Sequence, residues 1–349
     1  MALRFAWAWN KTNDPAYLND TNLWTLTGSI SQFYPNQATV FSGPAGFTSY
    51  SFARSLRLNS YVNTLSVDIP GAAISQGCWI SRMYFSGTWR TVADWIRLYD
   101  SGGSTVVSVR HLTQYVSLPL QGLYVNGVQV ATFGPISVSR QYDIAIGWNG
   151  ATSTATVYLD GVAVATGSSG AAFSVTDFEV RARGNGGGAN MYYDAWTIWD
   201  SAADDPSRTA IYVLPALPNA DVSTTGWTST GGNFYSQLSD GNDSTYAQST
   251  TTPSTGNLQI GCQSRADIDA NFTGGTIYGV GLQASAQGDG ALVSVEVGLD
   301  SGGSTATTSG YSTSTTGTWA YHLSLTDPNT GAAWTGAAFD AVTTLFEGS

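Results

Sequence analysis

The sequence predicts an all-β protein in which two β-sandwiches follow one another along the chain. In runs such as YDIAIGWNG (142–150), apolar residues alternate with smaller or polar ones, as in half-buried strands. Asp160-Gly161 and Asn126-Gly127 each separate two such runs, and they suit hairpin turns in which both residues need φ above zero. No window of 11 or more residues carries an apolar stripe at helical spacing.

The first 200 residues show short strand patterns separated by Gly, Asn and Asp turns. The start, MALRFAWAWN, alternates like a half-buried strand, and WIRLYDSGGSTVVSVRHL predicts a hairpin around 101–103. GLYVNGVQVATF and TATVYLDGVAVATG predict two further hairpins. FEVRARGNGGGANMYYDAWTIWD (178–200) predicts strand, glycine-rich turn and strand. We expect a sandwich of about a dozen strands.

One set of motif residues resembles a known fold family. The set comprises Trp148, Tyr158, Leu159, Asp160, Gly161, Asp194, Trp196, Trp199 and Asp200. A strand with Trp and Gly, a Y-L-D-G hairpin and a closing D-x-W-x-x-W-D strand resemble the second half of a concanavalin A-like jelly roll in its laminin-G-like form. The resemblance implies a sandwich domain over residues 1–203, is clearest over 140–200, and says almost nothing about function.

Between residues 202 and 219 the alternating strand pattern gives way to a polar stretch and then a proline-containing one, and this change marks the domain boundary. IYVLPALPN carries Pro215 and Pro218, which exclude a helix and predict an extended connector over 204–219. A second domain over 220–349 follows, with strands in NLQIGCQ, TIYGVGLQAS, ALVSVEVGL and WAYHLSL. Trp227 and Trp319 are expected to anchor its core.

The second half also resembles a family. Its motif residues are Leu217, Pro218, Asp221, Gly226, Trp227, Leu238, Asp240, Asp243 and Tyr246. They are similar to a small β-sandwich module of structural proteins of tailed bacteriophages, which implies a virion component. DSGGST occurs at 100–105 and again at 300–305. Either a hairpin was duplicated or a good turn sequence arose twice, and the few residue types that make turns favour the second explanation.

Composition excludes several partner classes. Charged residues make up 11% of the chain, the net charge is −11, and Lys11 is the only lysine. Such a surface repels phosphate backbones and anionic membranes, so nucleic acid is not expected as a partner. No run approaches the roughly 20 apolar residues of a membrane span, and the start lacks the pattern of a signal peptide. We therefore expect synthesis in a host cytoplasm without standard export or membrane insertion.

No catalytic residue is predicted. Glucanases of concanavalin-like folds carry a motif resembling E-x-D-x-E, but this chain has glutamate only at positions 179, 296 and 347. Asp267-Ile268-Asp269 is the nearest approximation, and we expect it to be a solvated loop. His111 and His322 are the only histidines, there is no G-x-S-x-G elbow, and both histidines are expected at surface or cross-strand positions.

Cofactor and metal signals are weak. GNGGGA (184–189) matches the dinucleotide fingerprint, but a strand follows where a helix is needed, so a hairpin tip is expected. Cys78 and Cys262 are expected to be core thiols. The loop 240–244 (DGNDS) groups oxygen ligands; Asx-turn chemistry explains it, and a calcium ion there is the open alternative, so no cofactor is assigned.

Glycan binding would need aromatic residues beside hydrogen-bonding groups. Trp89-Arg90 and the loop from Arg183 to Tyr193 offer such pairs, but neither is assigned as a site. The sequence thus favours a non-enzymatic virion structural protein of a tailed phage, displayed on the head or tail as a decoration, spike or fibre-associated subunit. Expected partners are capsid or tail subunits, further copies of the chain in a homo-oligomer such as a trimer, and host surface polysaccharide. A lectin-like adhesin is the alternative, and a carbohydrate-active enzyme is disfavoured.

Overall fold

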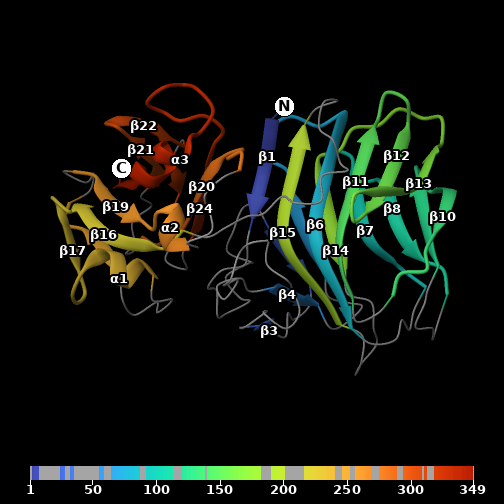
Figure 1. Cartoon of the computed structure of the whole chain (residues 1–349), viewed down its shortest axis with the longest axis horizontal. Helices are drawn as coiled ribbons and strands as arrows, with labels where there is room; N and C mark the ends of the chain where they lie inside the picture. The colour runs from blue at the N-terminus through green and yellow to red at the C-terminus, as the bar shows by residue number, and fades with distance from the viewer. Residues whose placement is uncertain are drawn as a thin grey trace. The chain divides into compact units, whose positions relative to one another are not determined.

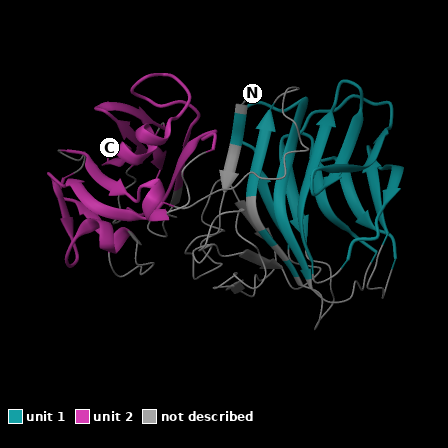
Figure 2. Ribbon diagram, in the orientation of Figure 1, with its two compact units in different colours: residues 1–19, 23–44, 50–213 teal, residues 20–22, 45–49, 214–349 magenta. Residues whose placement is uncertain are grey.

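The chain divides into two compact units, the first holding most of residues 1–213 and the second residues 214–349 (Figure 2). The computed structural model describes residues 2–7, 24–27, 32–34, 55–58, 64–86, 92–113, 120–137, 140–181, 190–200, 216–239, 246–251, 256–268, 275–288, 294–308, 310–312 and 318–348. Because most of the proposed connector lies outside these ranges, the boundaries at 203 and 219 stay predictions.

The first unit consists of two antiparallel sheets (Figure 1). The eight-stranded sheet has the order β13-β12-β11-β6-β15-β4-β3, with β1 also paired to β15, and the seven-stranded sheet has the order β10-β9-β8-β7-β14-β5-β2. The eight-stranded sheet comprises β1 (Ala2–Trp7), β3 (Gln32–Tyr34), β4 (Ser55–Leu58), β6 (Gln76–Ser86), β11 (Arg140–Asn149), β12 (Thr154–Leu159), β13 (Val162–Ser168) and β15 (Asn190–Asp200). The seven-stranded sheet comprises β2 (Trp24–Thr27), β5 (Thr64–Asp68), β7 (Asp94–Tyr99), β8 (Thr105–His111), β9 (Gln121–Val125), β10 (Val128–Phe133) and β14 (Asp177–Arg181). This is the jelly-roll sandwich that the sequence predicts.

Large aromatic side chains join the two sheets. Phe178 of the seven-stranded sheet packs against Trp79 and Trp196 of the eight-stranded sheet, with ring centroids 5.8 and 5.0 Å away. All three side chains are fully buried. Since side chains alternate across a strand, the inward direction of Phe178 sends its neighbours on β14 to the outer face of the sheet.

The sequence predicts that the two strands on either side of the glycine-rich run 184–189 pair with each other, and this prediction is wrong. Both strands form, but β14 pairs with β5 and β7, whereas β15 pairs with β1, β4 and β6 in the other sheet. The intervening residues 182–189 are more than a tight turn needs, so the two strands can join different sheets. Residues 182–189 themselves lie outside the described residues.

The two Asx-Gly hairpins are confirmed. Asn126 and Gly127 have φ of 46° and 77°, and Asp160 and Gly161 have φ of 49° and 78°. Both hairpins carry a register shift at the same distance from the turn. The edge strands β13 and β10 of the two sheets lie against each other at Gly167 and Val130. A Cβ added to Gly167 would lie only 2.5 Å from the Cβ of Val130. Only glycine leaves room for this contact, which closes one side of the sandwich.

In its described residues, the second unit is a smaller β-sandwich with three short helices. Its strands are β16 (Pro218–Ser223), β17 (Trp227–Ser229), β18 (Ala247–Ser249), β19 (Leu258–Cys262), β20 (Val280–Ala286), β21 (Ser294–Ser301), β22 (Ser304–Thr307), β23 (Tyr311–Ser312), β24 (Thr318–Ser324) and β25 (Thr343–Gly348). Its helices are α1 (Phe234–Ser239), α2 (Arg265–Ile268) and α3 (Gly336–Ala341). A sheet in the order β16-β19-β25-β21-β22, with β23 also on β21, packs against the β20-β24 pair, and β17 pairs with β18.

The core of the second unit only partly follows the prediction. Trp227 packs against the cluster of Phe234, Leu258 and Ile260, as expected. The tryptophan in the larger cluster is Trp334, which the sequence patterns did not single out, and the side chain of Trp319 lies outside the described part. No helix among the described residues is long and apolar enough to cross a membrane.

The repeated hexapeptide DSGGST forms two different turns. In the first copy Tyr99 pairs with Thr105, which leaves five residues in the loop. In the second copy Ser301 pairs with Ser304, so Gly302 and Gly303 alone make the turn. Identical sequences in different hairpin types favour independent origin over a duplicated hairpin.

Candidate functional site

The outer face of the seven-stranded sheet carries a connected set of charged and phenolic side chains. They alternate with core residues on β5, β14, β7, β8 and β9. We call this set the polar face. Its members are Asp68, Asp94, Arg97, Tyr99, Ser108, Arg110, Tyr124, Asp177, Glu179 and Arg181.

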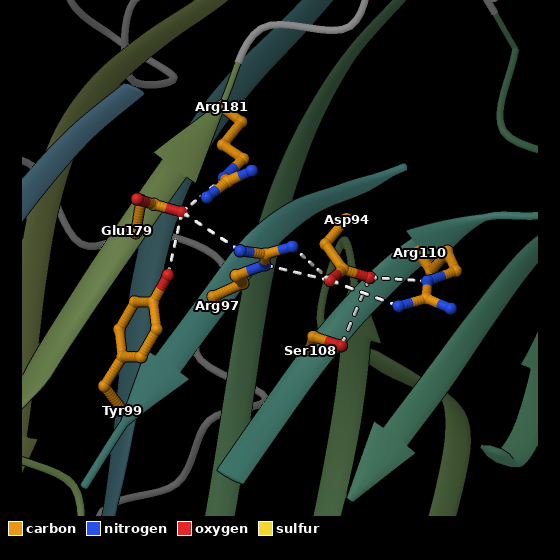
Figure 3. A network of polar contacts seen from close by, with 7 residues as sticks. All are labelled: Asp94, Arg97, Tyr99, Ser108, Arg110, Glu179 and Arg181. Atoms are coloured by element: carbon orange, nitrogen blue, oxygen red, sulfur yellow. Dashed lines mark hydrogen bonds and ion pairs between the residues drawn. The ribbon is translucent and has the colours of Figure 1, made fainter. Parts of the chain in front are cut away.

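Asp94 is the centre of one half of the polar face (Figure 3). Arg97 donates to Asp94 Oδ2 from Nε at 2.9 Å, and its Nη2 lies 2.8 Å from the same oxygen. From the next strand Arg110 donates through Nε to Oδ1 at 2.7 Å and through Nη2 to Oδ2 at 3.3 Å. One nearly buried carboxylate therefore fixes two guanidinium groups from neighbouring strands.

Glu179 is the centre of the other half. The hydroxyl of Tyr99 donates to Glu179 Oε1 at 3.0 Å, and Arg181 Nε donates to the same oxygen. Arg97 Nη1 lies 4.0 Å from this oxygen and so links the two halves. Across the sheet, Glu179 and Arg181 lie on β14, Arg97 and Asp94 on the neighbouring β7, and Arg110 on β8 (Figure 3).

The network sets the protonation of its members. Burial acts to raise the pKa of Asp94, but the hydrogen bond from Arg110 and the charge of Arg97 outweigh it, so this pKa lies below its ordinary value. Burial, and then the nearby Glu179 carboxylate, raise the pKa of Tyr99 despite the hydrogen bond with Arg97. Asp94 is therefore ionised and Tyr99 is a neutral donor at neutral pH.

A third element of the polar face is the acid pair Asp68 and Asp177. The two residues are directly opposite on the antiparallel strands β5 and β14. Burial, a hydrogen bond between the carboxyl groups and the charge of Asp177 raise the pKa of Asp68 to about 6. Asp68 therefore holds a proton below about pH 6 and is charged above it.

The polar face contains an acidic pattern that the sequence search missed. Asp177 and Glu179 are spaced i, i+2 on β14 and share its outer face. This arrangement is closer to the glucanase motif than the pair Asp267 and Asp269 is. The expected loop at Asp267 is wrong: Asp267 lies in α2, where its carboxylate accepts hydrogen bonds from Ser264, and Asp269 is outside the described residues. The third position on β14 is Arg181, so a carboxylate is replaced by a cation that contacts Glu179.

Both histidines lie inside the fold. His111 is fully buried opposite Gln121, with Nδ1 3.2 Å from Gln121 Oε1. His322 is buried opposite Leu282, and burial lowers its pKa. The cross-strand expectation is confirmed for both and the surface alternative is wrong, because each histidine occurs in an inward-facing position of its strand.

The cysteines, the aromatic pairs and the loop 240–244, which the sequence analysis also considered, provide no set of metal or ligand contacts among the described residues. Cys78 is buried and Cys262 half-buried; neither forms a disulfide, and burial raises the pKa of Cys262 to about 11. Trp89-Arg90 and loop 240–244 lie outside the described residues, as does most of the 183–193 loop, whose Tyr193 is buried in the core. Within the described ranges, no three His, Cys, Asp or Glu side chains are grouped to hold a metal ion.

Comparison with known proteins gives only weak similarities. No family model matches the chain, and no curated protein matches it. Among solved structures, the receptor binding domain of botulinum neurotoxin type G matches at 9% identity and a TM-score of 0.30, over 42% of this chain and 38% of that one. The Bacillus licheniformis β-glucanase matches at 12% identity and 0.33, over 56% and 98% of the two chains. A native heptameric SAP-like pentraxin from Limulus polyphemus matches at 14% and 0.32, over 53% and 79%. This chain spans less than half of the length of that receptor binding domain.

Proposed function

We propose that this protein is a non-enzymatic, lectin-like surface protein that binds glycans on the polar face. The observation that carries the proposal is the set of fixed guanidinium groups that stay partly open to solvent. The side chains of Arg97, Arg110 and Arg181 are 24%, 39% and 28% exposed, while the carboxylates that hold them are 5% and 11% exposed. Groups held in place before binding lose little entropy on binding, which favours recognition of flexible sugar chains.

The same contacts support a binding role over a catalytic one. A retaining glycosidase needs one carboxyl group as nucleophile and a second as acid, about 5–5.5 Å apart. Here Glu179 is engaged by Arg181 and Tyr99, and Asp94 by two arginines. Both carboxylates are thus committed to holding donors in place.

The proposed setting is the surface of a tailed bacteriophage virion. The protein would be synthesised in the host cytoplasm and then join capsid or tail subunits as a homo-oligomer, such as a trimer. The support is the motif of the second half, several of whose residues stabilise that unit. Asp221 accepts hydrogen bonds from the backbone of Phe234 and Tyr235 at the start of α1. Gly226 has φ of 81°, and Trp227 Nε1 donates to Gly256 O.

The glycan-binding proposal is tested with the purified chain in native gels containing host cell-surface polysaccharides. We expect retardation of the wild-type protein, loss of retardation in the double variant R110Q/R181Q, and no change in R140Q. Arg140 is the matched control because it is an exposed arginine paired with Asp160 on the eight-stranded sheet. Equal retardation of all three proteins would place binding elsewhere.

Three further measurements test the rest of the proposal. Release of reducing sugar at neutral pH from any bound polysaccharide would contradict a non-enzymatic role. Mass spectrometry of purified phage particles should detect the chain, and light scattering should report its copy number. Absence from particles would contradict the virion setting and leave glycan binding as a separate question.

A further inference from the structure

Charges on the polar face are segregated along the strand direction. Arg181 is four residues beyond Asp177 on β14, so the two ends of the face are about 13 Å apart. Strand register places Tyr99 beside Asp177 and Arg97 beside Glu179. One end therefore contains Asp68 and Asp177, and the other contains the arginines.

The arginine end exposes hydrogen-bond donors and buries acceptors. Arg181 uses Nε on Glu179, and among the described residues neither of its Nη atoms has an acceptor. Arg110 uses Nε and Nη2 on Asp94 and is the most exposed of the three arginines. A ligand that approaches this end meets N–H groups in fixed planes.

We propose that the arginine end binds the carboxylate of an acidic polysaccharide, while neighbouring sugar hydroxyls donate to the carboxylates at the acidic end. The inference rests on the proposed glycan-binding function and specifies its ligand class. A guanidinium fork matches a planar carboxylate with two parallel hydrogen bonds. Tyr99 pairs with Asp177 at the acidic end, and its hydroxyl donates to Glu179.

The acidic end limits the spacing of charge on the ligand. A second carboxylate within about 13 Å of the first would lie against Asp68 and Asp177 and be repelled. The net charge of −11 likewise opposes binding of dense polyanions at long range. The structure therefore fits a ligand in which one acidic sugar lies between neutral sugars.

The experiment uses the full chain and trisaccharide oligosaccharides of hyaluronan, each with one glucuronate between two neutral amino sugars, in isothermal titration calorimetry. The comparison ligands are the carboxyl-reduced form of the same oligosaccharides, polygalacturonate with a charge on every ring, and dextran sulfate. The variants are R181Q and R110Q, with R140Q as the control. Circular dichroism checks that each variant is folded; R110Q keeps the inference testable if R181Q is not.

We expect binding of the hyaluronan oligosaccharides, at least tenfold weaker binding of the carboxyl-reduced form and of both dense polyanions, and at least a tenfold loss in R181Q and R110Q. No binding of hyaluronan, equal affinity for the reduced form, or unchanged affinity in both variants would overturn the inference. If a neutral polysaccharide is bound and R110Q/R181Q abolishes its binding, the inference fails and the proposed function stands. If no glycan is bound, both fail.

Discussion

The guanidinium of Arg110 lies over the ring of Tyr124, with Cζ 4.5 Å from the ring centroid. The ring lies close to the backbone two residues earlier, since a Cβ on Gly122 would be 2.8 Å from Tyr124 Cε2. Arg110 also donates to Asp94. An aromatic face and a carboxylate thus hold one guanidinium, which sets its orientation at the arginine end of the polar face.

Replacing Tyr124 with leucine should release Arg110. We expect a loss of about 1 kcal/mol in the free energy of unfolding, because the cation–π contact and the cross-strand ring are removed. Tyr124→Phe is the control: it keeps the ring and loses the hydroxyl, with its hydrogen bonds to Gln129 and Arg110. Urea unfolding followed by tryptophan fluorescence measures both. Equal losses in the two variants would show that the ring face contributes nothing.

Asp94→Asn should destabilise the first unit far more than a change at an exposed ion pair. The Asp94 side chain is nearly buried and neutralises two guanidinium groups, so its removal should cost about 2–4 kcal/mol. Arg140→Gln, which breaks the exposed pair with Asp160, should cost less than about 1 kcal/mol. The measurement is the urea midpoint of each variant at pH 7. A loss at Asp94 as small as that at Arg140 would contradict the network.

Strands and turns were predictable where the signal is local. The strand β11 and the positive φ that Asn126 and Asp160 tolerate depend on neighbouring residues, and both predictions are confirmed. The expected half-buried alternation of β11 is wrong, since residues 144–148 are all buried. The sheet that each strand joins depends on partners far away in sequence. The wrong pairing of β14 with β15 shows this, since β14 lies between β5 and β7.

The candidate site was only partly visible in the sequence. The alternation of Asp177, Glu179 and Arg181 is visible in the sequence. It does not match a motif of three acidic residues, because the third residue is basic. Asp94 and Arg97 are about 80 residues away, and the pairing of β7 with β14 brings them alongside. No local pattern encodes that register.

The acid pair predicts a pH-dependent stability. Because the pKa of Asp68 is raised to about 6 from an unfolded value of 3.8, protonation favours the folded state. This contribution is complete below about pH 4 and is lost as the pH rises through 6. Asp68→Asn should therefore be more stable than the wild type at pH 7.5, by about 1 kcal/mol after solvent screening, and equal to it at pH 4. Urea unfolding at the two pH values checks this, and a larger difference at pH 4 would contradict it.

Gly167→Ala should disturb the contact that closes one side of the first sandwich. The added Cβ would lie 2.5 Å from Val130 Cβ, so one strand has to move, at a cost of about 1–3 kcal/mol. Gly281→Ala is the control, because there the nearest atom would be 3.4 Å away. Thermal unfolding of both variants gives the comparison, and a Tm drop no larger at 167 than at 281 would show that the edges can separate freely.

His322 should make the second unit sensitive to acid. Burial lowers its pKa below 6.5, and among the described residues its Nε2 has no hydrogen-bond partner. As the pH falls through 6.5 the unfolded chain takes up a proton that the folded chain excludes, so stability falls with pH until the folded pKa is reached. His322→Leu removes this difference, and its stability advantage over the wild type should be larger at pH 5 than at pH 8. Hydrogen exchange of peptides from β24 measures the effect, with β8 peptides as the internal reference. The same advantage at both pH values would mean that protonation of His322 is not linked to unfolding.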